Sequence, residues 1–146
     1  MFLSTYTPKL DEKGRFFLPP KYRPQLAEGL VITCSFDDCL AIYPMAAFQQ
    51  LSDRILDKDA TLEEVRDFQR IFGSGANDAK PDKQGRITLP AELRSYAHLD
   101  KDIVVTGALD HVEIWNPDAW AAYKRAKEPE YSAINKVIGL PPKTAG

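Results

Sequence analysis

One segment of this sequence occurs twice, at an offset of 71 residues. Residues 11–23 and 82–94 share Asp, Gly, Arg, Leu, Pro and Arg in the same order and at the same spacing. Six identities in thirteen positions are hard to attribute to chance. With one inserted residue the similarity continues through two further matches, 31–34 with 103–106 and 38–43 with 110–115. The chain is therefore predicted to hold two copies of one supersecondary unit, over most of residues 5–48 and 77–120.

Each copy begins with an extended segment that enters a tight turn. Asp11 and Gly14 stand at the first and fourth positions of the first turn, and Asp82 and Gly85 stand at the same positions of the second. Asp at the start and Gly at the end are typical of a type I turn closed by a left-handed residue. Such a turn between two extended segments predicts a β-hairpin in each copy.

The segment after each turn alternates in polarity, as a half-buried strand does. The apolar positions are Phe16, Leu18, Ile87 and Leu89, and the positions between them are Arg15, Phe17, Arg86 and Thr88. The two arginines are thus predicted to point away from the core. Pro19 or Pro90 then ends the strand and begins a short helix, and two more strands follow in each copy.

Helical patterns separate the copies. Pro44 is well placed to begin a helix that carries apolar residues at helical spacing as far as Ile55. Residues 61–64, Thr-Leu-Glu-Glu, form a capping-box pattern before a second amphipathic helix that extends to Phe72. Residues 73–75, Gly-Ser-Gly, are predicted to form a flexible joint.

A last helix is predicted to begin at residues 116–117, and residues 141–146 are predicted to be disordered. The expected organisation is repeat 1 at 5–47, a helical connector and linker at 48–76, repeat 2 at 77–120, and a C-terminal helix with a flexible tail at 121–146. Four short strands and one helical turn cannot bury both faces alone, but two such units can share a core about a pseudo-two-fold axis. The predicted fold is α+β and mainly β: a pair of half-barrels with peripheral helices.

The net charge of −2 and the isoelectric point near 5.7 argue, taken alone, against a nucleic-acid partner. The charge is unevenly distributed, however. Residues 9–23 hold five basic and two acidic side chains, and residues 80–94 hold four and two, so the rest of the chain is strongly acidic. The positive charge is therefore concentrated in the two copies of the repeated segment.

Other features predict a cytosolic protein with no membrane partner. No window approaches the roughly 18 apolar residues of a membrane span, and the N-terminus lacks the pattern of a signal peptide. Cys34 and Cys39 are not in a CxxC arrangement, so two reduced, packed cysteines are favoured over a disulfide or a zinc site. We expect no metal and no cofactor.

The doubled Asp-x-x-x-Arg segment, Asp11 to Arg15 and Asp82 to Arg86, resembles MraZ proteins of the AbrB-like swapped-hairpin superfamily, over roughly residues 1–130. The resemblance implies two tandem AbrB-like repeats and a regulator that binds double-stranded DNA of the bacterial division and cell-wall gene cluster near its own promoter. It also implies association with the nucleoid, ring-shaped homo-oligomers and no small-molecule substrate. By the same resemblance, Arg15 and Arg86 contact DNA, while Asp11, Gly14, Asp82 and Gly85 hold the turns.

Each of these residues also has a plainer interpretation. Arg15 and Arg86 lie four positions after Asp11 and Asp82, so each pair allows an ion pair that steadies the turn. The lysines near the turns are either phosphate contacts or solubilising charges: Lys9, Lys13, Lys21 and Lys83. Lys13 is replaced by Gln84 in the second copy, which allows the copies to bind unequally. For the aromatic residues, packing in the core or between subunits is favoured over stacking on bases: Phe48, Phe68, Phe72, Trp115 and Trp120.

Two other classes of protein are alternatives to this function. For an enzyme, Asp11 with Asp82, or His98 with His111, are the candidate acid–base pairs, but no nucleophile elbow, phosphate loop or metal-ligand spacing accompanies them. An AbrB-like antitoxin or transition-state regulator acting as a simple dimer is the stronger alternative. Such antitoxins usually carry one copy per chain, whereas this chain carries two.

Overall fold

The computed structural model describes residues 1–140, which divide into two compact units, Met1–Asn116 and the segment from Pro117 onward. The predicted disorder of residues 141–146 lies outside the described residues. Within residues 1–140, no helix has both the length and the apolar character needed to cross a membrane.

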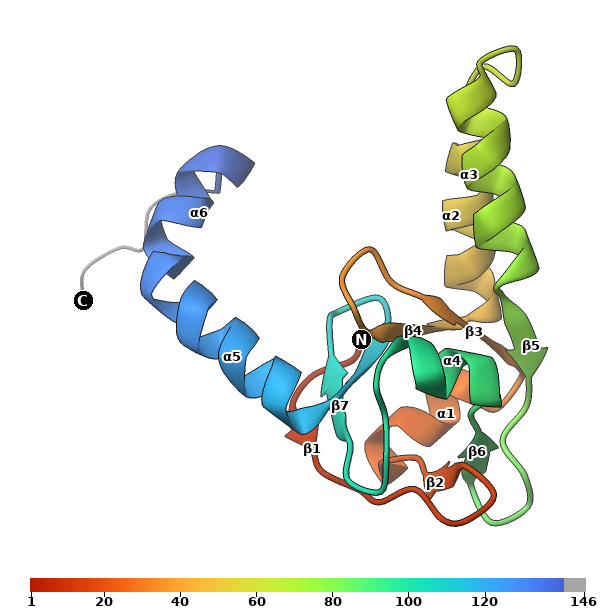
Figure 1. The fold of residues 1–146 in the computed structure, drawn as a ribbon, viewed down its shortest axis with the longest axis vertical. Coiled ribbons are helices and arrows are strands. Elements are labelled where there is room, and N and C mark those ends of the chain that lie inside the picture. The colour runs from red at the N-terminus through yellow and green to blue at the C-terminus, as the bar shows by residue number, and fades with distance from the viewer. Residues whose placement is uncertain (141–146) are drawn as a thin grey trace. The chain divides into compact units, whose positions relative to one another are not determined.

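The first unit holds all the strands of the described chain: β1 (Thr5–Tyr6), β2 (Arg15–Phe17), β3 (Leu30–Cys34), β4 (Leu40–Pro44), β5 (Asn77–Ala79), β6 (Arg86–Thr88), β7 (Val104–Gly107) and β8 (Val112–Trp115). Its helices are η1 (Pro20–Tyr22), α1 (Arg23–Leu26), α2 (Met45–Leu56), α3 (Glu63–Ser74) and α4 (Ala91–Tyr96). The second unit consists of α5 (Pro117–Lys127), η2 (Glu128–Glu130) and α6 (Tyr131–Ile138). The fold is therefore α+β and mainly β, as predicted (Figure 1).

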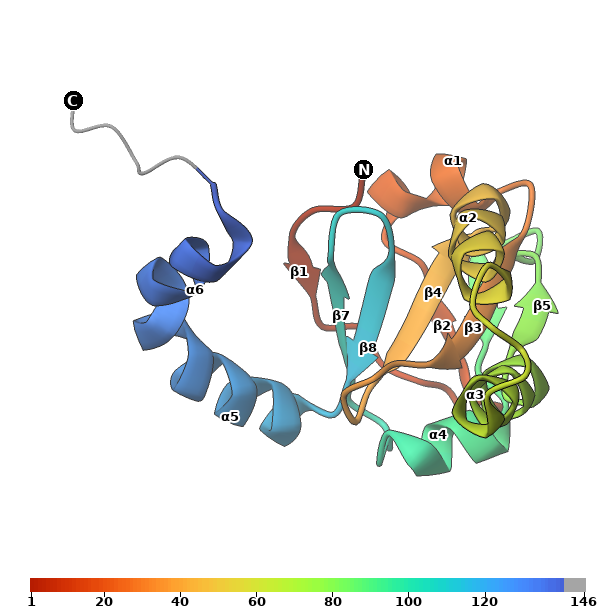
Figure 2. The same ribbon diagram turned by 90° about the horizontal axis from the view of Figure 1, so that it is seen from above.

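The strands form two sheets that interleave the repeats. Six strands lie in the order β1-β7-β8-β4-β3-β5, as Figure 2 shows, and β2 pairs with β6 in a separate two-stranded sheet. The first strand of each repeat pairs with a strand of the other repeat. In the first repeat β1 pairs with β7 of the second, and in the second repeat β5 pairs with β3 of the first. The repeats are thus exchanged with each other rather than placed side by side.

The predicted hairpins are the main correction to the sequence analysis. Each turn is closed by backbone hydrogen bonds, such as Asp11 N to Arg15 O at 2.8 Å, but the segments on its two sides then separate. The incoming segment joins the large sheet and the outgoing strand joins the ribbon formed by β2 and β6. Local turn chemistry predicted the turn correctly, but it contains no information about a pairing partner in the other repeat.

A pseudo-two-fold axis relates the repeats, as expected. In the large sheet β4 pairs with β8, with Ala41 opposite Glu113 at the centre of the register. In the small sheet Phe16 lies opposite Ile87. Both are pairs of equivalent residues, so the axis passes through both sheets.

The strand registers also correct one detail of the repeat alignment. Thr33 lies opposite Ala41, and Thr106 lies opposite Glu113. Thr33 therefore corresponds to Thr106, one position away from the match made by sequence alone. Both threonines are buried, which agrees with the structural correspondence.

The two repeats build one core. The fully buried side chains include Phe16, Leu18, Leu40, Ile42, Ile87, Leu89, Val112 and Ile114. The four apolar positions predicted for β2 and β6 are all among them. Burial of one such side chain contributes about 1.5–3 kcal/mol, so either repeat alone would leave much of this stabilisation unrealised.

The helices between the repeats begin and end differently from the prediction in two places. The α2 helix follows Pro44 directly, as predicted. The capping box is absent, because the Thr61 hydroxyl hydrogen-bonds Asp59 at 2.7 Å and Leu62 takes the N-cap position. The predicted joint at residues 73–75 is also wrong: Gly73 and Ser74 are the last residues of α3.

Aromatic packing joins α2 and α3, which lie side by side in Figure 1. The Phe48 and Phe72 rings stack with centroids 5.6 Å apart, and Phe68 stacks on Phe72 at the same distance. Trp115 is buried in β8, and Cys39 is buried before β4, where burial raises the pKa of its thiol to about 12. These contacts agree with the packing roles expected for the three phenylalanines and Trp115.

His111 makes the stability of the first unit depend on pH. Its ring lies between two carboxylates, with Nδ1 2.8 Å from Asp110 and Nε2 3.0 Å from Glu113, and it stacks on Tyr43. Burial alone would lower the pKa of His111, but the hydrogen bonds and charges of Glu113 and Asp110 outweigh it and raise this pKa above 6.5. The stabilisation by the protonated ring is therefore complete below that value and is lost as the pH rises through the folded-state pKa.

We expect the free energy of unfolding to be larger near pH 6 than near pH 8, as measured by urea denaturation. His111→Gln should remove most of this difference, because the neutral amide does not titrate. His98→Gln, at an exposed position after α4, serves as the control and should retain it. An unchanged pH dependence in His111→Gln would show that another group is responsible.

Candidate nucleic-acid interface

The two repeated turns have the same hydrogen-bond pattern. Asp11 Oδ1 accepts the backbone N–H groups of Lys13 and Arg15, both at 2.9 Å, and Gly14 N–H donates to the Asp11 carbonyl at 3.0 Å. The second turn repeats this pattern with Asp82, Gln84, Arg86 and Gly85. An aspartate at the first position thus organises each turn through its side chain, as in an Asx turn.

Each turn ends with an arginine paired to its aspartate. The Nε–H of Arg15 donates to Oδ2 of Asp11 at 2.7 Å, and Arg86 pairs with Asp82 at the same distance. Backbone hydrogen bonds from Arg15 lower the pKa of the Asp11 carboxyl, with its side chain contributing further, and Arg86 lowers the pKa of Asp82 in the same way. The ion pairs allowed by the four-residue spacing are therefore formed. Each uses one of the five N–H donors of a guanidinium and orients the group.

Both arginines lie on the outer face of the β2–β6 ribbon. Arg15 is opposite Thr88 and Arg86 is opposite Phe17 in the antiparallel register. The Arg86 guanidinium also lies over the Phe17 ring, 5.9 Å from its centroid. The opposite face, with Phe16 and Ile87, is buried. The ribbon therefore presents both arginines on the same side, at diagonal positions of neighbouring strands that are typically about 7–8 Å apart.

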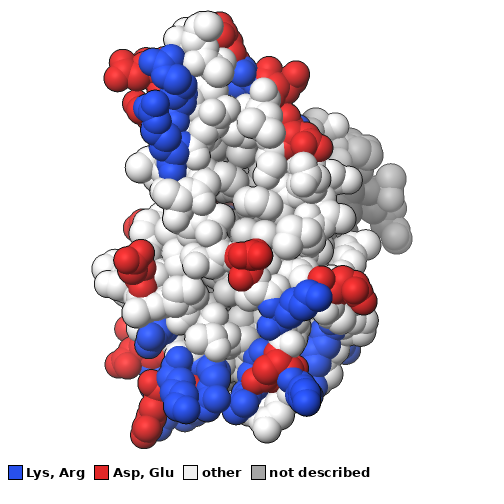
Figure 3. Space-filling view, turned by 90° about the vertical axis from the view of Figure 1, so that its right-hand side faces the viewer, with Lys and Arg blue, Asp and Glu red and all other residues white. Residues whose placement is uncertain are grey.

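The lysines predicted as contacts lie at and near the turns. Lys13 and Lys83 are exposed within the turns themselves, while Lys9 lies before the first turn and pairs with Asp102 at 3.6 Å. Lys21 is exposed in η1. In Figure 3 most of the Lys and Arg side chains in view lie at the lower end, among several Asp and Glu side chains, and a smaller group lies at the upper end. The lower end is the one that carries β2 and β6 in Figure 1. A concentration of cations at one end suits a polyanionic ligand despite the negative net charge.

Sequence reasoning missed two residues beside the turns, Arg23 and Arg94. The Nε–H of Arg23 donates to the Leu18 carbonyl at 3.0 Å, and that of Arg94 donates to the Leu89 carbonyl at 3.1 Å. A signal was present, because this arginine is the last of the six identities in the repeated segment. Its role was not evident, since its guanidinium packs against the turn of the other repeat.

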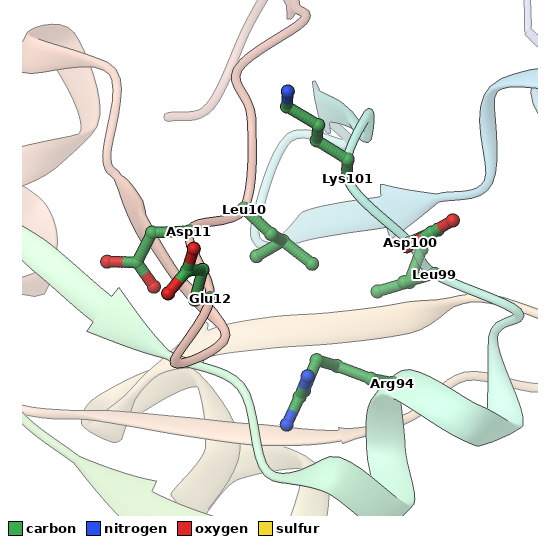
Figure 4. A pocket seen from close by; sticks show the side chains of 7 residues that line it. All are labelled: Leu10, Asp11, Glu12, Arg94, Leu99, Asp100 and Lys101. Atoms are coloured by element: carbon green, nitrogen blue, oxygen red, sulfur yellow. The ribbon is translucent and has the colours of Figure 1, made fainter.

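A hollow lies beside each turn. The first is lined by Leu10, Asp11, Glu12, Arg94, Leu99, Asp100 and Lys101. Figure 4 shows the Arg94 side chain extending from α4 toward the loop that holds Asp11 and Glu12. The equivalent hollow at the second turn has Arg23 in the place of Arg94. Carboxylates and cations are mixed in the first lining, so this hollow is not specific for one charge.

Among the candidate acid–base groups, Asp11, Asp82 and His111 are engaged elsewhere. Asp11 and Asp82 each pair with the arginine of their own turn, and His111 pairs with carboxylates of the β7–β8 hairpin. Within residues 1–140, no cluster of three or more His, Cys, Asp or Glu side chains is arranged to hold a metal ion.

The turn glycines provide a stability prediction. Gly14 and Gly85 have φ of +76° and +79°, in the left-handed region, where a β-branched residue is strained by about 1–3 kcal/mol. A Cβ at Gly14 would also lie 2.8 Å from Arg94 Nε. Gly14→Val should therefore lower the melting temperature by roughly 2–12 °C in a circular dichroism melt. Gly73→Val, at a helical position with open space around it, is the control for the added side chain. An unchanged melt for Gly14→Val would contradict the assigned turn.

Comparison with known proteins places these features in a family context. A family model described as "MraZ protein, putative antitoxin-like" matches residues 1–71 and again 72–136. A protein of Cutibacterium acnes named transcriptional regulator MraZ is 49% identical over 138 residues, covering 94% of this chain and 97% of that protein. Proteins of the same name from Mycobacterium tuberculosis H37Rv and Frankia alni are 51% and 45% identical, covering 92% and 94% of this chain and 94% and 96% of their own lengths.

Proposed function

The chain belongs to the MraZ family, and we propose that it is a sequence-specific DNA-binding transcriptional regulator. The observation that carries the proposal is the pairing of β2 with β6, which presents Arg15 and Arg86 together on one exposed face. A two-stranded ribbon is one of the structures that the DNA major groove admits. The names of the related proteins support regulation of transcription as the purpose of this binding.

In the proposed complex, the arginines contact bases and the lysines contact phosphates. Arg15 and Arg86 donate to guanine O6 and N7, the commonest specific contact of an arginine in the major groove. Lys13 and Lys83 neutralise phosphates beside them, and Lys9 adds a weaker contact because Asp102 competes for it. Asp11 and Asp82 orient the two guanidinium groups before DNA binds, so the arginines lose less side-chain entropy on binding.

The finer parts of the proposal concern assembly and target. We propose a cytoplasmic, nucleoid-associated ring of identical chains that binds repeated short boxes upstream of its own operon, within the division and cell-wall gene cluster. Exposed apolar side chains around α3 support self-association, among them Phe36, Phe68 and Ile71. The four segments expected from the sequence, 5–47, 48–76, 77–120 and 121–146, remain the proposed organisation of this chain.

The alternative is an AbrB-like antitoxin or transition-state regulator that acts as a simple dimer. The description of the matching family model as "antitoxin-like" favours this alternative. The mass of the assembly distinguishes the two proposals. In this chain the two repeats already pair with each other, whereas a protein with a single copy would need a second chain for that pairing. A discrete ring of several subunits in native mass spectrometry supports the proposal. A dimer supports the alternative.

The proposed function is tested with the DNA upstream of the chain's own coding sequence. Fluorescence anisotropy in a salt series should show tighter binding to this DNA than to a shuffled duplex of equal length and composition. The affinity should fall as salt increases, because phosphate contacts release counterions. Equal affinity for both duplexes would reject sequence-specific regulation.

A further inference from the structure

Arg23 and Arg94 join the two repeats at the turns. The Arg94 guanidinium packs against Gly14 of the first repeat so closely that a Cβ on Gly14 would lie 2.8 Å from its Nε and 2.9 Å from its Cζ. Arg23 packs in the same way against Gly85 of the second repeat, where the corresponding distances are 2.7 and 2.8 Å. Each arginine therefore contacts the turn of the other repeat.

At each turn, the leucine that follows the ribbon strand of the other repeat is hydrogen-bonded to both the glycine and the arginine. Leu89 N–H donates to the Gly14 carbonyl at 2.8 Å, while the Leu89 carbonyl accepts the Nε–H of Arg94 at 3.1 Å. At the other turn, Leu18 N–H donates to the Gly85 carbonyl at 3.0 Å, and the Leu18 carbonyl accepts Arg23 at 3.0 Å. The backbone of one leucine residue thus hydrogen-bonds the turn glycine through its N–H and the arginine through its carbonyl.

We infer that Arg23 and Arg94 are positioning residues for DNA binding, each setting the place of the opposite repeat's turn on the ribbon. This inference rests on the proposed function. The aspartate of each turn fixes its internal shape through hydrogen bonds within residues 11–15 or 82–86. Those bonds do not fix where the turn lies relative to the other strand. The leucine–glycine backbone hydrogen bond and the arginine packed against the glycine supply that restraint together.

Arginine is suited to this task because of its shape. A guanidinium can pack closely against a glycine, which has no Cβ, while its Nε–H reaches a carbonyl. Both arginines are half-buried, and their contacts are directed inward to the turn and to a leucine carbonyl. They act on DNA through the turns, so their removal should leave the number of phosphate contacts unchanged.

The test is a set of double-mutant cycles with the upstream DNA. Arg94→Met should weaken binding about tenfold without changing the slope of affinity against salt. Combined with Arg15→Ala it should add little further loss, because Arg94 acts through that turn, whereas with Arg86→Ala the two losses should multiply. Arg23→Met provides the matched control, with the coupling reversed: strong to Arg86→Ala and absent to Arg15→Ala.

A second measurement does not depend on DNA. In amide NMR spectra, Arg94→Met should shift residues 11–15 more than residues 82–86, and Arg23→Met should do the reverse. If Arg94→Met does not fold, Arg94→Lys replaces it, with the same expected pattern. The inference is overturned if each variant perturbs the turn of its own repeat, or if the salt slope falls by about one as for a lost phosphate contact. If Arg15→Ala and Arg86→Ala bind like the parent, the proposed function fails, and the NMR result still decides the positioning role.

Discussion

Arg15→Ala is expected to weaken binding to the upstream DNA by roughly 5- to 150-fold, which corresponds to the roughly 1–3 kcal/mol of a bidentate arginine–guanine contact. The substitution also leaves the Asp11 carboxylate without its 2.7 Å partner on a surface that faces phosphates, and this repulsion adds to the loss. The fold should remain, because a partly exposed ion pair contributes little to stability. Anisotropy titrations measure the affinity, and circular dichroism with native mass spectrometry checks the fold and assembly.

Arg86→Ala should behave in the same way but more mildly, because the second turn carries Gln84 where the first carries Lys13. Lys58→Ala, in the turn between α2 and α3, removes one exposed charge far from the ribbon in sequence and serves as the control. It should bind within about twofold of the parent, as expected for an exposed charge outside the contact surface. Parental affinity in both arginine variants would show that the ribbon is not the contact surface.

Binding should increase steeply with the number of boxes in the DNA. One chain offers only two small basic segments and neutralises few phosphates, so a single contact is weak and sensitive to salt. In a ring, once one ribbon has bound, the next binds at high effective concentration, and avidity of about 10²–10⁴ is available without new contacts. A duplex with several boxes is therefore expected to bind about 10²-fold or more tightly than a duplex with one.

The spacing of the boxes should matter as much as their number. Ribbons on successive subunits reach the same face of the duplex only if the boxes recur near one helical turn, about 10 base pairs. An insertion of about 5 base pairs moves one box to the opposite face and should cost more affinity than substitution of the bases between boxes. Equal binding to one box and to several, or indifference to the insertion, would remove the multivalent mechanism even if DNA binding itself remained.

The sequence predicted local structure well because the signals were local. Alternation placed Phe16, Leu18, Ile87 and Leu89 in the core, where each is almost fully buried. Gly at the end of each turn predicted the left-handed conformation that both glycines adopt. Proline predicted the starts of the short helices after β2 and β6, with Pro19 and Pro90 at the N-cap positions.

Pairing between distant segments was not predictable in the same way. Local sequence patterns are similar in the two repeats, so they do not indicate whether β1 and β5 pair within their own repeat or, as observed, with strands of the other repeat. The role of Arg94 was hidden for the same reason, because its contact is Gly14, eighty positions earlier in the chain. The capping-box pattern at Thr61 failed because Asp59, two residues earlier, competes for the hydroxyl.

Site-specific crosslinking tests most directly whether the β2–β6 ribbon is the DNA-binding surface. Phe17 is 53% exposed on the ribbon, and Phe36 is 76% exposed in the β3–β4 loop, where it packs on Phe68. A photoreactive phenylalanine analogue at either position replaces one exposed aromatic ring with another, and native mass spectrometry checks that both variants, including the one on the proposed self-association surface, assemble like the parent. The account predicts a crosslink to the upstream DNA from position 17 and none from position 36. A crosslink from position 36 with none from position 17 would contradict it.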